Sequence, residues 1–218
     1  MNYLVVDLEM CRVPRDFRSK NYRYANETIQ IGAVLLDDEF KRIGTLSQYV
    51  YPEHGVIDPF IQNLTGISNG HVKKAPKLQE ALIHLIDWIG DREYKVYAWS
   101  STDRNQIMRE IKAKHIQDSR IDALMEEERW IDYQAVFSQR YDFDRGLSLQ
   151  EALERADIAG EGRSHDGLDD AVNTGQLIEK LEMDPDFQLA SYEVPEKDKG
   201  DCIYSLGELF AGLNLKLA

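Results

Sequence analysis

The sequence is poor in cysteine. It has only two, Cys11 and Cys202, which lie at opposite ends of the 218-residue chain without the spacing of metal ligands. This argues against a disulfide framework and against a zinc site built on clustered cysteines. We therefore expect a protein of the reducing cytoplasm.

Long hydrophobic runs are also absent. No apolar stretch approaches the ~20 residues that span a bilayer. The first residues do not show a basic segment followed by an apolar one, so we expect neither a secretion signal nor a membrane partner. A chain of 218 residues suits one well-buried core with a tail, and no internal repeat divides it.

An excess of positive charge is the third absence. The chain has 26 Lys and Arg against 39 Asp and Glu, which gives a net charge of −13. This argues against binding of nucleic acid through a general basic surface. It does not exclude an enzyme that holds a phosphodiester through bound cations, because metal ions then supply the positive charge locally.

What the sequence does contain begins with an apolar stretch, residues 4–10, that carries two acids on alternate positions. Side chains alternate between the two faces of a strand, so Asp7 and Glu9 share one face and Val6 and Leu8 share the other. Two neighbouring carboxylates in an apolar strand repel each other and lose solvation. Asp7 and Glu9 are therefore either a pair of metal ligands or part of the solvent-exposed face of an edge strand.

The rest of the chain alternates strand and helix patterns, which predicts an α/β fold with a mixed sheet. Residues 1–183 form the predicted domain, and residues 184–218 a linker and an amphipathic tail helix over 204–217. A loop is expected between Pro52 and Pro59, and Gly66 is expected at a turn or helix end. Further strands are expected over residues 28–36, 41–51, 94–99 and 130–131, and helices over 77–89, around 107–111, and over 133–140, 149–156 and 168–181.

More acids lie where helices are expected to begin. Asp103 follows a strand and opens a helix, and Asp170 lies in the first turns of the last helix, just after His165. Each has a purely structural alternative, because Asp103 and Asp166 suit N-caps and acids near a helix start suit its dipole. His165, with an unperturbed pKa near neutrality, has the chemistry of a general base.

Taken together, Asp7, Glu9, Asp103 and Asp170 provide four carboxylates. Four acids at one point require cations, and hard oxygen ligands favour Mg²⁺ or Mn²⁺ over zinc. Two such ions would make a two-metal phosphoryl-transfer site in which His165 deprotonates the attacking water.

These motifs resemble those of the DEDDh 3′→5′ exonucleases (DnaQ-like, ribonuclease H-like fold). Within that family they are most similar to the ERI-1, 3′hExo and KapD-like branch. The resemblance covers residues 2–183. One departure is Trp-Ser-Ser-Thr-Asp before the second motif, where relatives commonly carry Trp-Gly-x-x-Asp. The matching segments are Asp-Leu-Glu at 7–9, Ala-Trp before Asp103, His165 five residues ahead of Asp170-Ala171, the strand at 27–34 and Leu-Thr-Gly-Ile at 64–67.

The resemblance implies a mixed five-stranded sheet flanked by helices, and hydrolysis of single-stranded RNA or DNA from its 3′ end to nucleoside 5′-monophosphates. RNA is favoured by the branch that the motifs resemble. Leu8, Met10, Trp99 and Arg163 are candidate substrate contacts. Leu8 and Trp99 suit a core position as an alternative, and the Arg- and Tyr-rich segment 12–24 suits either a substrate channel or a solvated loop.

Three alternatives stay open at this point. The enzyme could act on DNA, or the fold could serve a non-catalytic binding or regulatory protein, although no acid of the motifs is lost. The tail at 204–217 could bind a protein partner, with Leu206, Leu209, Phe210 and Leu213 at helical spacing.

Overall fold

The computed structural model describes residues 1–17 and 24–190, and its centre is a mixed five-stranded sheet. Its order is β3-β2-β1-β4-β5, with β1 antiparallel to β2 and parallel to β4. The expected tail helix lies outside the described residues. The strands are β1 (Asn2–Arg12), β2 (Asn26–Leu36), β3 (Arg42–Tyr49), β4 (Tyr94–Ala98) and β5 (Trp130–Asp132).

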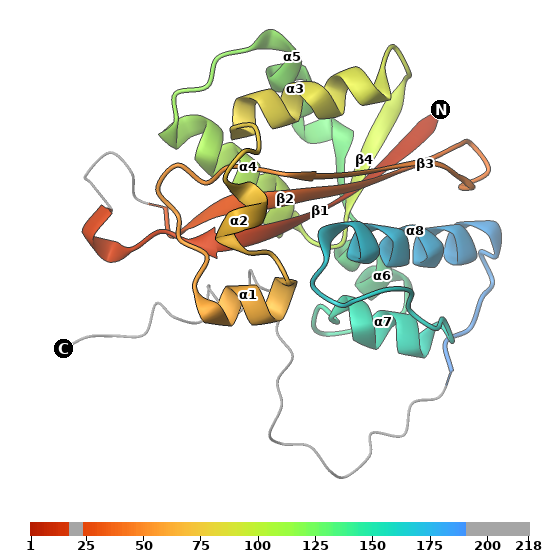
Figure 1. Ribbon diagram of the computed structural model, residues 1–218. Coiled ribbons are helices and arrows are strands. Elements are labelled where there is room, and N and C mark those ends of the chain that lie inside the picture. The colour runs from red at the N-terminus through yellow and green to blue at the C-terminus, as the bar shows by residue number, and fades with distance from the viewer. Residues whose placement is uncertain (18–23, 191–218) are drawn as a thin grey trace.

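Two layers of helices cover the sheet (Figure 1). In the figure α3, α4 and α5 lie above the strands, and α6, α7 and α8 lie below them, with α1 near one end of the sheet. Among the described residues, every helix is too short or too polar to cross a bilayer. The helices are α1 (Pro59–Thr65), α2 (Asn69–Val72), α3 (Leu78–Ile89), α4 (Ser101–Ala113), α5 (Ser119–Leu124), α6 (Tyr133–Arg140), α7 (Leu149–Arg155) and α8 (Gly167–Met183), with 3₁₀ turns at Arg15–Phe17 and Glu127–Arg129.

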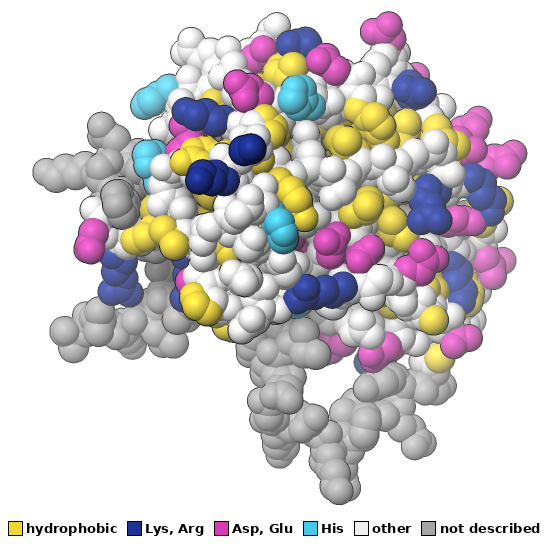
Figure 2. Space-filling model, in the orientation of Figure 1, with side chains coloured by type: hydrophobic (Ala, Val, Ile, Leu, Met, Phe, Trp, Pro, Cys, Tyr) yellow, Lys and Arg dark blue, Asp and Glu magenta, His cyan; other side chains and the backbone are white. Residues whose placement is uncertain are grey.

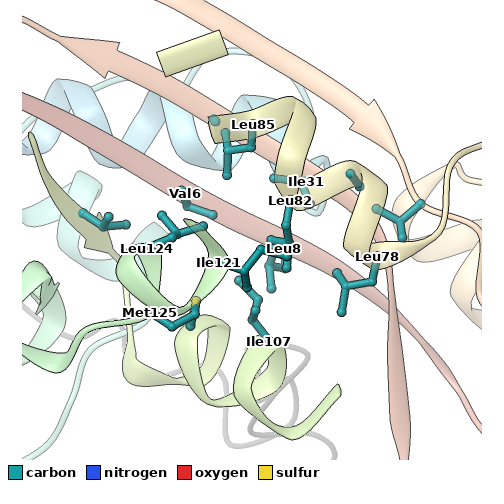
Figure 3. Packing of buried hydrophobic residues seen from close by; sticks show 14 of the residues in the cluster. Val6, Leu8, Ile31, Leu78, Leu82, Leu85, Ile107, Ile121, Leu124 and Met125 are labelled. Carbon is teal, nitrogen blue, oxygen red and sulfur yellow. The ribbon is translucent and has the colours of Figure 1, made fainter. Parts of the chain in front are cut away.

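The alternation along β1 divides the core in two. Even-numbered residues such as Val6 and Leu8 pack under α3, α4 and α5, together with Leu82 and Ile107 (Figure 3). Val5, on the other face, belongs to the cluster between the sheet and α6, α7 and α8. Asp7 and Glu9 therefore face the layer of α8, as the strand periodicity predicts. The edge-strand alternative is wrong, because β1 is the central strand.

The close approach of α8 to the sheet depends on Gly32, which pairs with Asp7 across β1 and β2. A Cβ atom on Gly32 would lie within 3.0 Å of backbone atoms of Gly167 and Leu168, where α8 begins. Backbone cannot yield as a flexible side chain can. The absence of a side chain at Gly32 thus allows the first turn of α8 to sit beside Asp7.

We expect Gly32→Ala to lower the free energy of unfolding by about 3 kcal/mol, because α8 must shift to admit the methyl group. The melting temperature should fall by roughly 6–12 °C. Gly175→Ala is the matched control, since its Cβ would make ordinary contacts of 3.7 Å or more with side chains of β1 and β2. The control variant should melt at or above the temperature of the unaltered protein. Equal melting temperatures for the two variants would contradict the close-approach argument.

An ion-pair cluster fixes the far end of α4 to β2. Lys114 Nζ lies 2.9 Å from Glu27 Oε1 and 2.8 Å from Glu110 Oε2, and all three side chains are buried. Glu110 Oε1 also accepts hydrogen bonds from the Thr28 backbone N–H (2.7 Å) and hydroxyl (2.6 Å). Removing one partner of such a buried pair is strongly destabilising, so the cluster holds α4 in register with the sheet.

The expected loop between Pro52 and Pro59 contains no helix, but a short helix that the sequence analysis did not predict follows it. The short helix α1 begins at Pro59, and the Asp58 side chain caps it by accepting the Ile61 N–H at 2.9 Å. Gly66 ends it with φ of +75°, as the turn or cap prediction expects. Pro at the first helical position and Gly after the last are the ordinary boundary signals of a helix too short to show periodicity.

The first residues of the predicted linker pack on the domain. Tyr141 donates its hydroxyl to the Phe187 carbonyl at 3.1 Å, and Ala190 N–H bonds the Arg155 carbonyl at 2.9 Å. Lys180 Nζ lies 4.8 Å from the centre of the Phe187 ring. The course of the chain beyond residue 190, and the protein partner expected for the tail, stay predictions.

Candidate active site

One cavity of about 230 Å³ gathers the acids that the sequence singles out. Asp7 and Glu9 reach it from the middle of β1, Asp103 from the first turn of α4 and Asp170 from the first turn of α8. His165, in the loop before α8, lines the same cavity. Side chains from three distant parts of the chain thus line one cavity.

Asp103 is held against β1 rather than used as a helix cap. Its Oδ1 accepts a hydrogen bond from the Leu8 backbone N–H at 3.2 Å, and the residue is 6% exposed. The N-cap of α4 is Ser100, whose hydroxyl accepts the Thr102 N–H at 3.2 Å. The capping alternative for Asp103 is therefore wrong, and its carboxylate lies beside the strand residue that separates Asp7 from Glu9.

The start of α8 presents Asp170 and the loop that carries His165. Asp166 is the N-cap, as one alternative expects, and its carboxylate accepts the N–H groups of Leu168 (3.0 Å) and Asp169 (3.4 Å). Asp170 Oδ2 accepts the backbone N–H of His165 at 2.9 Å. One ligand atom each from Glu9, His165 and Asp170 lie within 4.8 Å of one another.

The carboxylates disturb one another strongly. Burial raises the pKa of Asp7 and Glu9 well above their usual ranges, and the charges of the neighbouring acids raise them further. Burial likewise raises the pKa of Asp103 to about 7 and that of Asp170 to about 6. At neutral pH these groups cannot all ionise without a counter-charge.

Glu9 supplies an independent sign that the cavity suits a cation. The residue is 1% exposed, and its Oε2 finds no hydrogen-bond donor among the described residues. A buried carboxylate oxygen without a partner costs free energy unless a cation or a proton satisfies it. The donor set of four carboxylates and one imidazole fits a divalent ion that prefers hard oxygen ligands.

The pKa of His165 is lowered, whereas the pKa values of the acids are raised. Burial lowers its pKa below the ordinary value, and the positive charge of Arg163 lowers it further. The imidazole is therefore neutral at physiological pH, which is the protonation state that a general base needs.

The predicted substrate contacts are divided between the cavity and its surroundings. Leu8, Met10 and Trp99 line the cavity and are 4%, 3% and 6% exposed, so each is also part of the core. Trp99 Nε1 donates to the Leu147 carbonyl at 3.1 Å, which fixes the indole. Arg163 does not line the cavity; its Nη2 bonds the Asn63 and Leu64 carbonyls at 2.5 and 3.0 Å.

Sequence reasoning missed a second wall of the cavity. Leu149 and Leu153 of α7 are the apolar residues of this second wall, and Asn173 of α8 is a polar one. The capping box at Ser148 and Glu151 predicts α7 but cannot tell what the helix faces.

Sequence reasoning also missed Gln30. Gln30 accepts the Gly167 N–H at 3.1 Å and donates to Asp166 Oδ1 at 3.4 Å, so it connects β2 to the start of α8.

Comparison with known proteins agrees with this geometry. The chain is 29% identical over 166 residues to human 3′-5′ exoribonuclease 1, and 28% identical over 166 residues to the rat protein of that name, covering 74% of this chain and 48% of each relative. It is 25% identical over 178 residues to the Drosophila melanogaster 3′-5′ exonuclease Snipper, covering 72% of this chain and 62% of that one. The chain thus spans about half the length of the exoribonucleases that it matches.

Solved structures share the fold. The nuclease domain of 3′hExo, a DEDDh family member bound to rAMP, superimposes with a TM-score of 0.71 at 21% identity, over 88% of this chain and 97% of that one. E. coli Exonuclease I in complex with a dT13 oligonucleotide gives a TM-score of 0.61 at 16% identity, over 83% and 41% of the two chains. A family model described as Exonuclease matches residues 4–178, and the chain therefore belongs to the exonuclease family.

Proposed function

We propose that this protein is a metal-dependent 3′→5′ exonuclease that degrades single-stranded nucleic acid, RNA in preference to DNA, to nucleoside 5′-monophosphates. The observation that carries the proposal is the convergence of Asp7, Glu9, Asp103 and Asp170 with His165 on one cavity. The preference for RNA is supported by relatives named as exoribonucleases. Hydrolysis of DNA is the alternative that the experiment below separates.

The four acids would hold two divalent ions, Mg²⁺ or Mn²⁺, which fit the unpartnered Glu9 Oε2 and the raised pKa values of the acids. Bound ions of this kind lower the pKa of water and stabilise charge on the leaving oxygen. His165 accepts the proton of the attacking water. Leu8, Met10 and Trp99 line the space for the terminal nucleotide.

The surface charge suits recognition at the cavity rather than along a basic face. Figure 2 shows Lys and Arg side chains interspersed with Asp and Glu over one face of the described residues, and the chain as a whole carries a net charge of −13. Long-range attraction of a polyanion is therefore weak. We expect binding to depend on divalent ions at the 3′ end more than on contacts with distant phosphates.

The proposal is tested with 5′-labelled RNA and DNA oligonucleotides of matched sequence, in Mg²⁺, in Mn²⁺ and in EDTA. We expect stepwise shortening from the 3′ end, faster on RNA and absent in EDTA. His165→Ala should lower kcat about 10²- to 10⁴-fold and still bind Mn²⁺. Internal fragments, or full activity in EDTA, would contradict the proposal, and faster shortening of the DNA would reverse the expected preference.

A further inference from the structure

Arg163 connects the loop that carries His165 to helix α1, which has no role in the proposed catalysis. It lies in the loop between α7 and α8, two residues before His165, and its guanidinium reaches α1. Its Nη2 donates to the carbonyl oxygens of Asn63 at 2.5 Å and Leu64 at 3.0 Å, about a hundred residues away in sequence.

The end of α1 is suited to receive a guanidinium. The last carbonyls of a helix lack intrahelical partners, and the negative end of the helix dipole favours a cation there. The Gly66 N–H bonds the Gln62 carbonyl at 2.8 Å, which leaves the Asn63 and Leu64 carbonyls to Arg163. The two hydrogens of Arg163 Nη2 can each serve one of these carbonyls, and the planar guanidinium fixes the direction of both bonds.

Gly66 permits this contact in two ways. Its φ of +75° is a left-handed conformation that glycine adopts without a steric cost. A Cβ atom there would also lie within 3.0 Å of Arg163 Nη1. The Leu-Thr-Gly-Ile segment at 64–67 and the Gly-Arg-Ser-His segment at 162–165 are therefore halves of one contact.

The other side of the loop is fixed to α8. Arg163 N–H donates to Asp169 Oδ2 at 2.7 Å, and Asp166 N–H bonds the Arg163 carbonyl at 3.2 Å. His165 has φ of +63°, a conformation that costs a β-carbon-bearing residue free energy and persists only where its surroundings impose it. The loop is thus held between α8 and α1, and Arg163 makes the contact with α1.

We propose that Arg163 is a positioning residue: it clamps the His165 loop to the end of α1 and so fixes the imidazole at the cavity. This inference rests on the proposed nuclease function, with His165 as the base. It assigns to Arg163 a task other than the phosphate contact expected from the sequence, because its Nη2 donates to two main-chain carbonyls.

The test compares Arg163→Met, Arg163→Lys and Gly66→Ala by steady-state hydrolysis of a 5′-labelled RNA and by titration with Mn²⁺. Loss of the clamp should lower kcat about 10- to 100-fold, because a small displacement of the base is enough to slow proton transfer. KM and the Mn²⁺ affinity should stay within about twofold of the unaltered protein. Arg163→Lys should recover part of the rate, since lysine can still donate to one carbonyl.

Two further comparisons sharpen the result. Arg163→Met combined with Gly66→Ala should be no slower than the slower single variant, because both changes break the same contact. Arg120→Met, on the exposed face of α5 where Arg120 pairs with Asp87 at 3.1 Å, is the control and should match the unaltered protein. A raised KM with unchanged kcat for Arg163→Met would overturn the clamp in favour of a phosphate contact.

Hydrogen exchange separates the clamp from the nuclease proposal. Arg163→Met should speed exchange of the backbone amides at 163 and 165, which bond Asp169 and Asp170 in the closed loop. Unchanged exchange would overturn the clamp. If the unaltered protein hydrolyses neither RNA nor DNA, the proposed function fails, while faster exchange in the variant still supports a loop held by Arg163.

Discussion

Asp7→Asn is expected to remove nuclease activity and to stabilise the metal-free protein at the same time. Asp7 lies on the central strand among three other acids of the cavity. Loss of a carboxylate that holds the divalent ions should slow hydrolysis roughly a thousandfold or more, which corresponds to about 4 kcal/mol in the activation free energy. Single-turnover hydrolysis of a 5′-labelled RNA in Mn²⁺ measures the loss.

The gain in stability has an electrostatic cause. Burial and the charges of Asp103, Asp170 and Glu9 raise the pKa of Asp7, so its ionised form costs free energy in the folded state. A neutral amide of similar shape removes that cost, and the variant should melt at a higher temperature in EDTA at pH 8. Asp91→Asn, an exposed acid just before β4, is the control and should change neither property. An Asp7→Asn variant that melts lower than the unaltered protein would contradict this account.

The second expected result is that the metal-free protein becomes less stable as the pH rises from about 4 to 8. The folded-state pKa values of Asp103, about 7, and Asp170, about 6, lie above the ordinary value of 3.8. For acids raised in this way, the folded state binds more protons than the unfolded state between these values. Their contribution is present at low pH and is lost as the pH rises through 6 and 7.

Divalent ions should reverse this dependence, because they bind the ionised acids of the folded state. The measurement is the melting temperature at pH 5 and pH 8, each in EDTA and in Mn²⁺. We expect Mn²⁺ to raise the melting temperature far more at pH 8 than at pH 5. An equal effect of Mn²⁺ at both pH values would show that the cavity acids are not the groups that bind it.

Periodicity predicts the long elements well and the short ones poorly. The alternation in β1 and the apolar face of α3 need only local sequence, and both elements lie where expected. The helix α1 was missed because its seven residues, Pro59–Thr65, give no helical repeat, and α5 was missed because it has only six residues. Short helices form where tertiary contacts support them, which a single sequence does not show.

The candidate site shows the same limit. The residues around Asp103 suit a helix cap as well as a metal ligand, but the carboxylate accepts the Leu8 N–H on a strand 95 residues away, which local sequence cannot show. Arg163 looks like a phosphate contact by charge, but it bonds the carbonyl oxygens that end α1, a helix that the sequence does not reveal. The acids and His165 were identified by motif and lie together, whereas their roles in holding metal and moving a proton stay predictions.

The buried ion-pair cluster at the far end of α4 restricts where residues can be inserted or deleted in this chain. Asp103 and Glu110 are seven residues apart, close to two full turns, so both carboxylates face the sheet. One residue inserted between them would turn one carboxylate about 100° away from its strand partner. Insertions and deletions are therefore expected in the loops before and after α4. The seven-residue interval between Asp103 and Glu110 should stay constant in relatives that retain both acids.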